Sequence, residues 1–319
     1  MDDRIKDYLH EIYGNDEAIL IAKKLKTLID KWRKVLPKVE SSPDGRLPVS
    51  SEDSIMITYG DSLQEEGKTP LQALHDFALK RFDGAVKGIH VLPFSPYSSD
   101  DGFSVIDYRE VNPDLGTWGD LEALGKNFRL MADLVLNHCS AQGPWFRAFL
   151  AGEEPYKEFF IIVEEGTDLS AVFRPRALPL LHEFEVAGEK RQVWTTFSGD
   201  QVDLNFANPL VFLEMVDILL SYVSKGIRVI RLDAIGFLWK EIGTSCMHHP
   251  LTHLMVKLFR LVLAETAPGT ILITETNVPH KENISYFGEG NDEAHMVYQF
   301  PLPPLTLDAF IRGDRKSVV

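Results

Sequence analysis

The sequence is poor in cysteine, has no long apolar run and has fewer basic than acidic residues. Only Cys139 and Cys246 occur, so we expect two inert buried thiols in a reducing cytoplasm rather than a disulfide framework. No stretch of about 18 uninterrupted apolar residues appears, and residues 1–14 do not pair a cationic start with an apolar run. We therefore expect a cytoplasmic protein that neither spans a membrane nor is secreted.

The charge balance excludes the usual polyanion partners. Lys and Arg number 33 against 47 Asp and Glu, which gives a net charge of −14. Such a field repels nucleic acid and anionic membranes, so neither is expected as a partner. With 45% apolar residues over 319 positions, the chain is long enough for one large domain with an insertion.

The first 53 residues predict a helical extension followed by a linker. Apolar residues recur at helical spacing over 4–36, which indicates two amphipathic helices. The Ser-, Pro- and Gly-containing stretch 39–54 predicts a linker.

From residue 54 onward, short apolar strands alternate with helical segments, which is typical of parallel β/α units. The predicted strands are 54–60, 88–94, 130–138, 227–236, 270–277 and 296–302, and helices are predicted near 69–81, 119–126, 209–225 and 247–265. The predicted fold class is α/β, a (β/α)8 TIM barrel. Its parts are barrel strands one to three in 54–138, an insertion in 139–206, and strands four to six in 207–319.

Six predicted strands fall two short of the eight that close such a barrel. Residues 302–314 are followed by the ending RKSVV, where we find neither a helix-closing pattern nor a further strand. We therefore expect a C-terminally truncated chain.

The fourth predicted strand ends in a cation and an acid. The period of two in a strand places Arg231 and Asp233 on one side. We expect Arg231 to lower the pKa of Asp233 and keep it ionised, as a carboxylate nucleophile requires. A buried structural ion pair is the alternative interpretation.

The fifth predicted strand also ends in an acid, Glu275. Retaining glycoside chemistry needs a nucleophilic carboxylate and a proton-donating carboxyl about 5 Å apart, and adjacent parallel strands provide that spacing. Glu275 is therefore the predicted proton donor for the nucleophile Asp233. A surface glutamate at a strand end is the alternative.

Two further strand ends carry polar groups. His138 follows the third strand, where a neutral imidazole could bind a sugar hydroxyl, although a lone histidine is more often structural. After the second strand come Asp100, Asp101 and, past a glycine, Phe103, a loop able to bind hydroxyls and stack on a sugar ring.

In this order, the segments DLVLNH (133–138), IRLDAIG (230–236) and ITETN (273–277) resemble the first three conserved segments of the α-amylase superfamily, glycoside hydrolase family 13. The resemblance implies that Asp233 is the nucleophile, Glu275 the general acid/base, Arg231 the neighbouring arginine and His138 a contact of the first sugar. It also implies that 139–206 is the B domain. In amylases the asparagine corresponding to Asn137 helps to hold calcium, whereas here we expect a metal-free role.

Finer strings resemble the sucrose-phosphorylase subfamily: ITYGDSL (57–63), the segment 88–108, RPRALPLL (174–181) and VWTTFSGDQVDLN (193–205). This resemblance implies that Asp100 and Phe103 line the glucose site and that Arg174 or Arg176 contacts phosphate, an arginine fork being suited to its oxygens. A solvated or ion-paired loop is the alternative for the two arginines. Phe237 replaces the tyrosine usual in sucrose phosphorylases, which favours a different acceptor.

Within the subfamily, the N-terminal extension and the run 273–305 are most similar to glucosylglycerate phosphorylases. The implied reaction is retaining transfer of glucose from an α-glucoside to inorganic phosphate, without cofactor or metal. Sucrose phosphorylase, an amylase-type hydrolase or transglucosylase, and an inactive fragment are the alternatives. The superfamily's fourth segment, whose Asp stabilises the transition state, has no candidate after Phe300, and the oligomeric state is not predicted.

Overall fold

The computed structural model describes residues 1–37, 49–82, 84–290 and 292–313. Most of the linker predicted over 39–54 and the RKSVV ending lie outside these described residues. No helix in the described ranges is long and apolar enough to cross a membrane.

The centre of the molecule is a parallel sheet in which six strands follow the order β1-β2-β3-β9-β10-β11. The predicted parallel β/α sheet is thereby confirmed. The last strand is shorter than predicted over 296–302, because the chain turns and Leu302 begins a helix. The strands are β1 (Ile55–Thr58), β2 (Gly88–Val91), β3 (Arg129–Val135), β9 (Ile227–Asp233), β10 (Ile271–Thr274) and β11 (Met296–Val297).

Helices connect these strands as the sequence pattern predicts. Several begin with recognisable caps: Asn208 accepts a hydrogen bond from Leu210 N–H ahead of Pro209, and Thr117 forms a capping box with Asp120. The connecting helices are α3 (Pro70–Phe82), α4 (Trp118–Leu124), α6 (Pro209–Ser224) and α7 (Pro250–Thr266).

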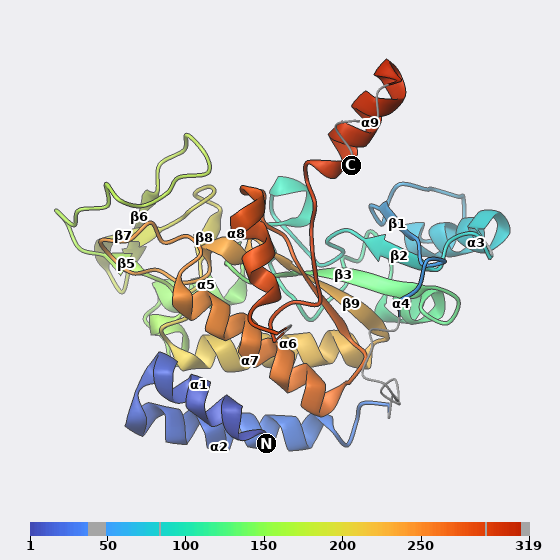
Figure 1. The fold of residues 1–319 in the computed structure, drawn as a ribbon. Helices are drawn as coiled ribbons and strands as arrows, with labels where there is room; N and C mark the ends of the chain where they lie inside the picture. The colour runs from blue at the N-terminus through green and yellow to red at the C-terminus, as the bar shows by residue number, and fades with distance from the viewer. Residues whose placement is uncertain (38–48, 83, 291, 314–319) are drawn as a thin grey trace.

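The N-terminal extension is a helical hairpin, as predicted. Helices α1 (Asp3–Tyr13) and α2 (Asn15–Trp32) turn at Gly14, whose φ of 78° suits glycine. They pack beneath α6 and α7 on the side of those helices away from the sheet (Figure 1). This contact buries one apolar stripe of each helix, including Ile5, Leu25 and Ile29.

The long excursion after β3 has more regular structure than its pattern indicated. It contains a three-stranded antiparallel sheet in the order β5-β7-β6, and its two ends meet because β4 pairs antiparallel with β8. Its elements are β4 (His138–Ser140), α5 (Pro144–Leu150), the short η2 turn (Tyr156–Glu158), β5 (Ile162–Val163), β6 (Leu181–Val186), β7 (Glu189–Trp194) and β8 (Gln201–Asp203).

Short 3-10 turns and the short helix α8 follow the central strands, and a longer helix follows β11. These elements are η1 (Asp100–Gly102), η3 (Ile235–Phe237), α8 (His280–Ile284), η4 (Ser285–Phe287) and α9 (Leu302–Arg312). Helix α9 extends away from the body (Figure 1). Gly313 ends α9 in the left-handed conformation. The RKSVV ending, where we expected neither a helix-closing pattern nor a further strand, lies outside the described residues.

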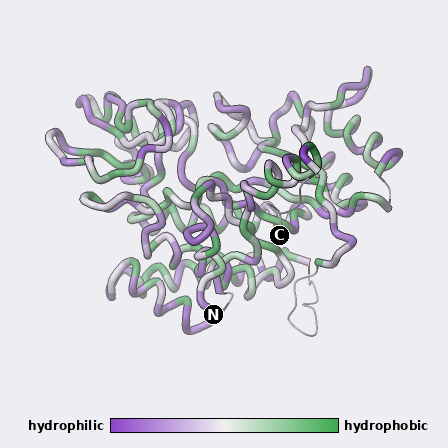
Figure 2. The backbone as a smooth tube through the Cα atoms, turned by 45° about the horizontal axis from the view of Figure 1, so that its top comes forward, coloured by the Kyte–Doolittle hydropathy of each residue, from purple (hydrophilic) through white to green (hydrophobic). Residues whose placement is uncertain are grey.

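Apolar segments run through the centre of the fold and hydrophilic ones prevail in the outer loops (Figure 2). The strand register places Ile57, Met131 and Val229 on the same sheet face as Arg231 and Asp233. On the two edge strands, this face is open: Ile57 is 56% and Met296 39% exposed. The middle of the face is buried, and this is where the polar side chains meet.

Candidate active site

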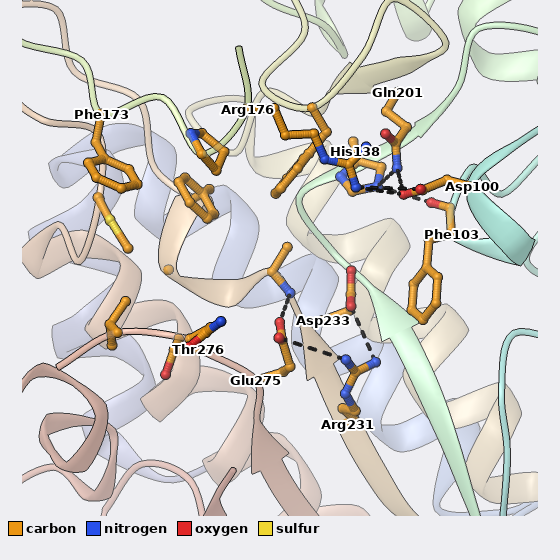
Figure 3. Close-up of a pocket in the computed structure, with 18 of the residues that line it drawn as sticks. Asp100, Phe103, His138, Phe173, Arg176, Gln201, Arg231, Asp233, Glu275 and Thr276 are labelled. Carbon is orange, nitrogen blue, oxygen red and sulfur yellow. Dashed lines mark hydrogen bonds and ion pairs between the residues drawn. The ribbon is translucent and has the colours of Figure 1, made fainter. Parts of the chain in front are cut away.

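One cavity of about 530 Å³ lies at the carboxyl ends of the central strands. Such strand ends are where β/α folds usually bind ligands. All of the predicted site residues except Arg174 line it: Asp100, Phe103, His138, Arg176, Arg231, Asp233, Phe237 and Glu275. Figure 3 shows most of them pointing toward the same space.

Asp233 and Glu275 come from neighbouring strands. Asp233 ends β9 and Glu275 directly follows β10, and the register pairs Leu232 with Thr274 just before them. Adjacent strands lie about 4.8 Å apart, so the two acids lie side by side at the cavity floor. Arg231 reaches both, with Nη1 3.3 Å from Asp233 Oδ1 and Nη2 3.9 Å from Glu275 Oε1 (Figure 3).

The backbone beside these acids is strained. Ala234 has a φ of 51°, and its N–H donates to Glu275 Oε2 at 3.3 Å. On the opposite wall, Asp100 and Asp101 have φ values of 55° and 51°. Non-glycine residues in this region are uncommon, and such strain gathers at functional sites.

The guanidinium of Arg231 is fixed from several sides. Its Nη1 also contacts the buried carboxylate of Asp133 on β3. The rings of Phe103 and Tyr298 lie 5.5 and 5.3 Å from its central carbon, distances at which a cation is attracted to an aromatic face. Arg231 thus divides its charge among three carboxylates.

This arrangement corrects one expectation. Arg231 does lower the pKa of Asp233, but burial raises it more, and repulsion from Glu275 and Asp133 adds to the rise, so the pKa of Asp233 lies well above its ordinary value. The attraction of Arg231 does not offset burial, because its guanidinium also contacts Asp133.

The wall opposite the acids centres on Asp100. Its carboxylate accepts from Gln201 Nε2 at 2.8 Å and from Arg176 Nη2 at 3.2 Å. The loop that carries Asp100 is held by Asp200, whose Oδ2 accepts hydrogen bonds from the hydroxyls of Ser98, Ser99 and Ser104. The carboxylate of Asp200 therefore stabilises the strained turn.

His138 lies beside Asp100 as a neutral imidazole. Burial lowers its pKa to about 4. Its Nε2 lies 3.0 Å from Phe103 O and 3.1 Å from Gln201 Nε2. His138 thereby connects the start of β4 to the Phe103 loop.

The cavity mouth is mostly aromatic. Phe237 packs edge-on against Phe197, with ring centres 5.3 Å apart, and stacks on Phe173 at 6.3 Å. The Arg176 guanidinium lies over Phe197. Arg174 is outside the cavity lining, and its guanidinium donates to the carbonyl of Leu178 within its own loop.

Asn137 contacts an ammonium group. Its Oδ1 lies 2.6 Å from Lys240 Nζ, which also pairs with Asp203 Oδ2 at 2.6 Å and reaches the carbonyl of Phe237. A metal at these oxygens would clash with the ammonium in position and charge, so the residues do not fit the calcium known from amylases. In the described ranges, no group of three or more His, Cys, Asp or Glu side chains could hold a metal ion.

Several residues at the site escaped the sequence reasoning. Asp133 and His90 both lie on the sheet face that carries Arg231. Nothing in the sequence near either residue indicates that they are hydrogen-bonded to each other. Gln201, Lys240 and Tyr298 come from distant segments. Only the tertiary fold brings them together.

Known proteins resemble this chain in both sequence and structure. The chain is 59% identical over 98% of its length to a glucosylglycerate phosphorylase of Spirochaeta thermophila, and 48% identical over 97% to one of Escherichia coli, covering 53% and 55% of those proteins. A sucrose phosphorylase of Bifidobacterium adolescentis is 33% identical over 82% of this chain and 53% of its own. The chain thus spans about half the length of these curated relatives.

A similar solved structure is the sucrose 6F-phosphate phosphorylase from Thermoanaerobacter thermosaccharolyticum, with a TM-score of 0.74, 29% identity and coverage of 84% of this chain and 56% of that one. The family described as "Alpha amylase, catalytic domain" matches residues 83–311. These residues include the strands that carry His138, Asp233 and Glu275. The chain therefore belongs to the α-amylase catalytic-domain family.

Proposed function

We propose that this chain carries the glucosyl-transfer site of a glucosylglycerate phosphorylase, which converts 2-O-α-glucosylglycerate and inorganic phosphate to α-glucose 1-phosphate and glycerate. The observation that carries the proposal is the pair Asp233 and Glu275, side by side on neighbouring strand ends and both within reach of Arg231. The names of the relatives at 59% and 48% identity supply the substrate class.

In the first step, the ionised carboxylate of Asp233 attacks the anomeric carbon while the carboxyl of Glu275 gives its proton to the departing glycerate oxygen. The C–O bond to glycerate breaks and a β-glucosyl ester of Asp233 forms. In the second step, a phosphate oxygen attacks the same carbon, Glu275 takes the phosphate proton, and Asp233 leaves. Two inversions restore the α configuration.

The wall residues have binding roles in this proposal. Asp100, His138 and Gln201 offer hydrogen-bonding groups for glucose hydroxyls opposite the acids, and Phe103 offers a ring face.

Arg176 is the cation at the mouth that is not enclosed by carboxylates on several sides, and it suits the phosphate oxygens and the carboxylate of glycerate. Phe237 shapes the acceptor side, where it packs on Phe173.

We also propose that the sheet is part of an eight-stranded barrel and that residues 139–206 form the B domain of the α-amylase superfamily. The inward-facing Ile57 on one edge strand and Met296 on the other are exposed, as expected of a curved sheet whose remaining strands would cover them. In this division, 1–53 is the helical extension, 54–138 holds strands one to three, 139–206 is the insertion, and 207–319 holds strands four to six.

The proposed function is tested by release of phosphate from α-glucose 1-phosphate by this chain. Parallel reactions contain glycerate, fructose, glycerol or water alone as acceptor. Release with glycerate supports the proposal. Release with fructose alone would reassign the site to sucrose phosphorolysis, and release with water alone, or none at all, would overturn the phosphorylase assignment.

Two variants tie turnover to the carboxylates. Asp233→Asn removes the attacking group and should abolish transfer. Glu275→Gln should abolish transfer from glucosylglycerate but spare part of it from α-glucosyl fluoride, whose leaving group needs no proton. Full activity in the Asp233 variant would refute the assignment of the nucleophile.

A further inference from the structure

A histidine outside the cavity lining is connected to the charged groups of the site through one carboxylate, Asp133. His90 is only 1% exposed and lies on β2, outside the cavity lining. Its Nε2 lies 2.8 Å from Asp133 Oδ2, and the Asp133 side chain is completely buried. The other oxygen of Asp133 contacts Arg231.

These contacts form a continuous path across three adjacent strands. It begins at His90 on β2, passes Asp133 on β3 and ends at Arg231 on β9, whose Nη1 lies 3.3 Å from Asp233. The ladder fixes the spacing, because β2 pairs with β3 and β3 with β9, with Asp133 directly opposite Arg231. Every contact in this path joins two side chains of the protein.

We propose that His90 is a positioning residue: its hydrogen bond to Asp133 Oδ2 fixes the carboxylate whose other oxygen holds Arg231 against Asp233. The consequence for catalysis rests on the proposed function, in which Asp233 is the nucleophile. The structural relationship can be tested without turnover.

The direction of the hydrogen bond is determined by chemistry. An ionised carboxylate only accepts, so His90 Nε2 must carry the proton. The other ring nitrogen, Nδ1, is buried and has no hydrogen-bond partner in the described part of the chain. The imidazole is therefore oriented by Asp133, and Asp133 is in turn held between His90 and Arg231.

Loss of the His90 donor changes how Arg231 is shared. Asp133 would then depend on Arg231 alone for its neutralisation and would draw the guanidinium away from Asp233. The other charged groups that act on Asp233 are Glu275 and Asp100, both negative, while Tyr298 covers Arg231 from β11. None of them replaces the lost cation, so Asp233 should hold its proton to a higher pH.

Two substitutions separate the hydrogen bond from simple packing. His90→Phe fills the space of the ring without a donor. His90→Gln can place its amide nitrogen near the position of Nε2 and keep the donor. The readout is the carboxyl ¹³C resonance of Asp233 through a pH titration, assigned by its disappearance in Asp233→Asn.

We expect His90→Phe to raise the titration midpoint of Asp233 by roughly half a pH unit or more, and His90→Gln to stay near the wild-type midpoint. Equal shifts in both variants, or no shift in either, would overturn the proposal. In an active chain, His90→Phe should also lower kcat about 10- to 100-fold with little change in KM. Absence of turnover in the wild type would count against the proposed function and would leave the titration result standing.

A measurement on the unaltered chain covers the case in which His90→Phe does not fold. Imidazole ¹⁵N–¹H spectra should show His90 protonated at Nε2, with a slowly exchanging proton that is lost in Asp133→Leu. If His90 carries its single proton on Nδ1, it donates nothing to Asp133, and the proposal fails.

Discussion

Arg231 lies 3.3 Å from Asp233, measured from Nη1 to Oδ1, and that same nitrogen contacts Asp133. The strand pattern in the sequence pairs Arg231 with Asp233, whereas in the structure the same nitrogen of Arg231 contacts both Asp233 and Asp133. A single cation cannot fully compensate two buried carboxylates and the nearby Glu275. The pKa of Asp233 is therefore raised, and its ionised form costs stability, which is common where function requires buried charge.

The first prediction concerns the stability of Asp233→Asn. Because the folded-state pKa of Asp233 is raised, folding favours its protonated form. Its contribution to stability is present below the unfolded pKa and is lost as the pH rises through the folded value. At pH 7 the neutral Asn should therefore increase the free energy of unfolding, measured by urea denaturation, and the gain should shrink as the pH falls. A less stable variant at pH 7 would mean that attraction by Arg231 outweighs burial.

A second prediction concerns His138, whose pKa is lowered to about 4 by burial from a reference value of 6.5. Between these values the unfolded chain binds more protons, so stability falls as the pH drops from about 7.5 to 5, by roughly 2 kcal/mol from this group. His138→Gln keeps a donor for Phe103 O and removes the titration. The wild type should lose more stability than the variant over this interval in paired denaturation curves. Parallel curves would show that His138 titrates normally.

A third prediction compares Arg174 and Arg176, two arginines that are separated by one residue in the insertion. Arg176 lies at the cavity and Arg174 bonds to a loop carbonyl outside it. Arg176→Gln should raise the KM for phosphate roughly tenfold or more, the scale of a lost hydrogen bond to a charged group. Arg174→Gln should leave the KM near wild type, because water can satisfy its exposed carbonyl partners. Similar KM values in the two variants would remove Arg176 from the phosphate site.

The sequence predicted the order of the strands and helices because each has its own local signal. The period of α7 and the apolar run of β9 are visible without tertiary information. The acids at the strand ends could also be predicted, since parallel strands bring their carboxyl ends to one edge. The partners of those acids could not, because His90, Asp133 and Arg231 are far apart in the chain and meet only through strand register. Helix α9 was not predicted, and in the described structure none of its residues is buried.

A fourth prediction tests whether Asp200 stabilises the strained loop that carries Asp100. Asp200→Ala leaves the hydroxyls of Ser98, Ser99 and Ser104 without their shared acceptor. The amides of Ser98 and Ser104 are bonded within this loop, so their hydrogen exchange should accelerate about tenfold or more. Asp168→Ala, an exposed loop aspartate bonded to Ser170, is the control and should not change exchange over 98–104. Unchanged exchange in both variants would show that the loop holds its shape without Asp200.

The last prediction concerns the ammonium of Lys240, which is 4% exposed and pairs with the fully buried Asp203. Asp203 also accepts from Thr196 and Asn137, so the pair joins β8 to the end of β3. Lys240→Met leaves that carboxylate without its cation and should lower the free energy of unfolding by about 3 kcal/mol or more.

The double variant Lys240→Met/Asp203→Asn should lose less than Lys240→Met alone, because the charge left uncompensated is removed as well. A chelator or added calcium should leave the thermal midpoint of the wild type unchanged, since the ammonium already lies among the oxygens a cation would need. A calcium-dependent midpoint would show that a metal displaces Lys240. In that case the insertion is joined to the sheet by a bound ion rather than by a side chain of the protein.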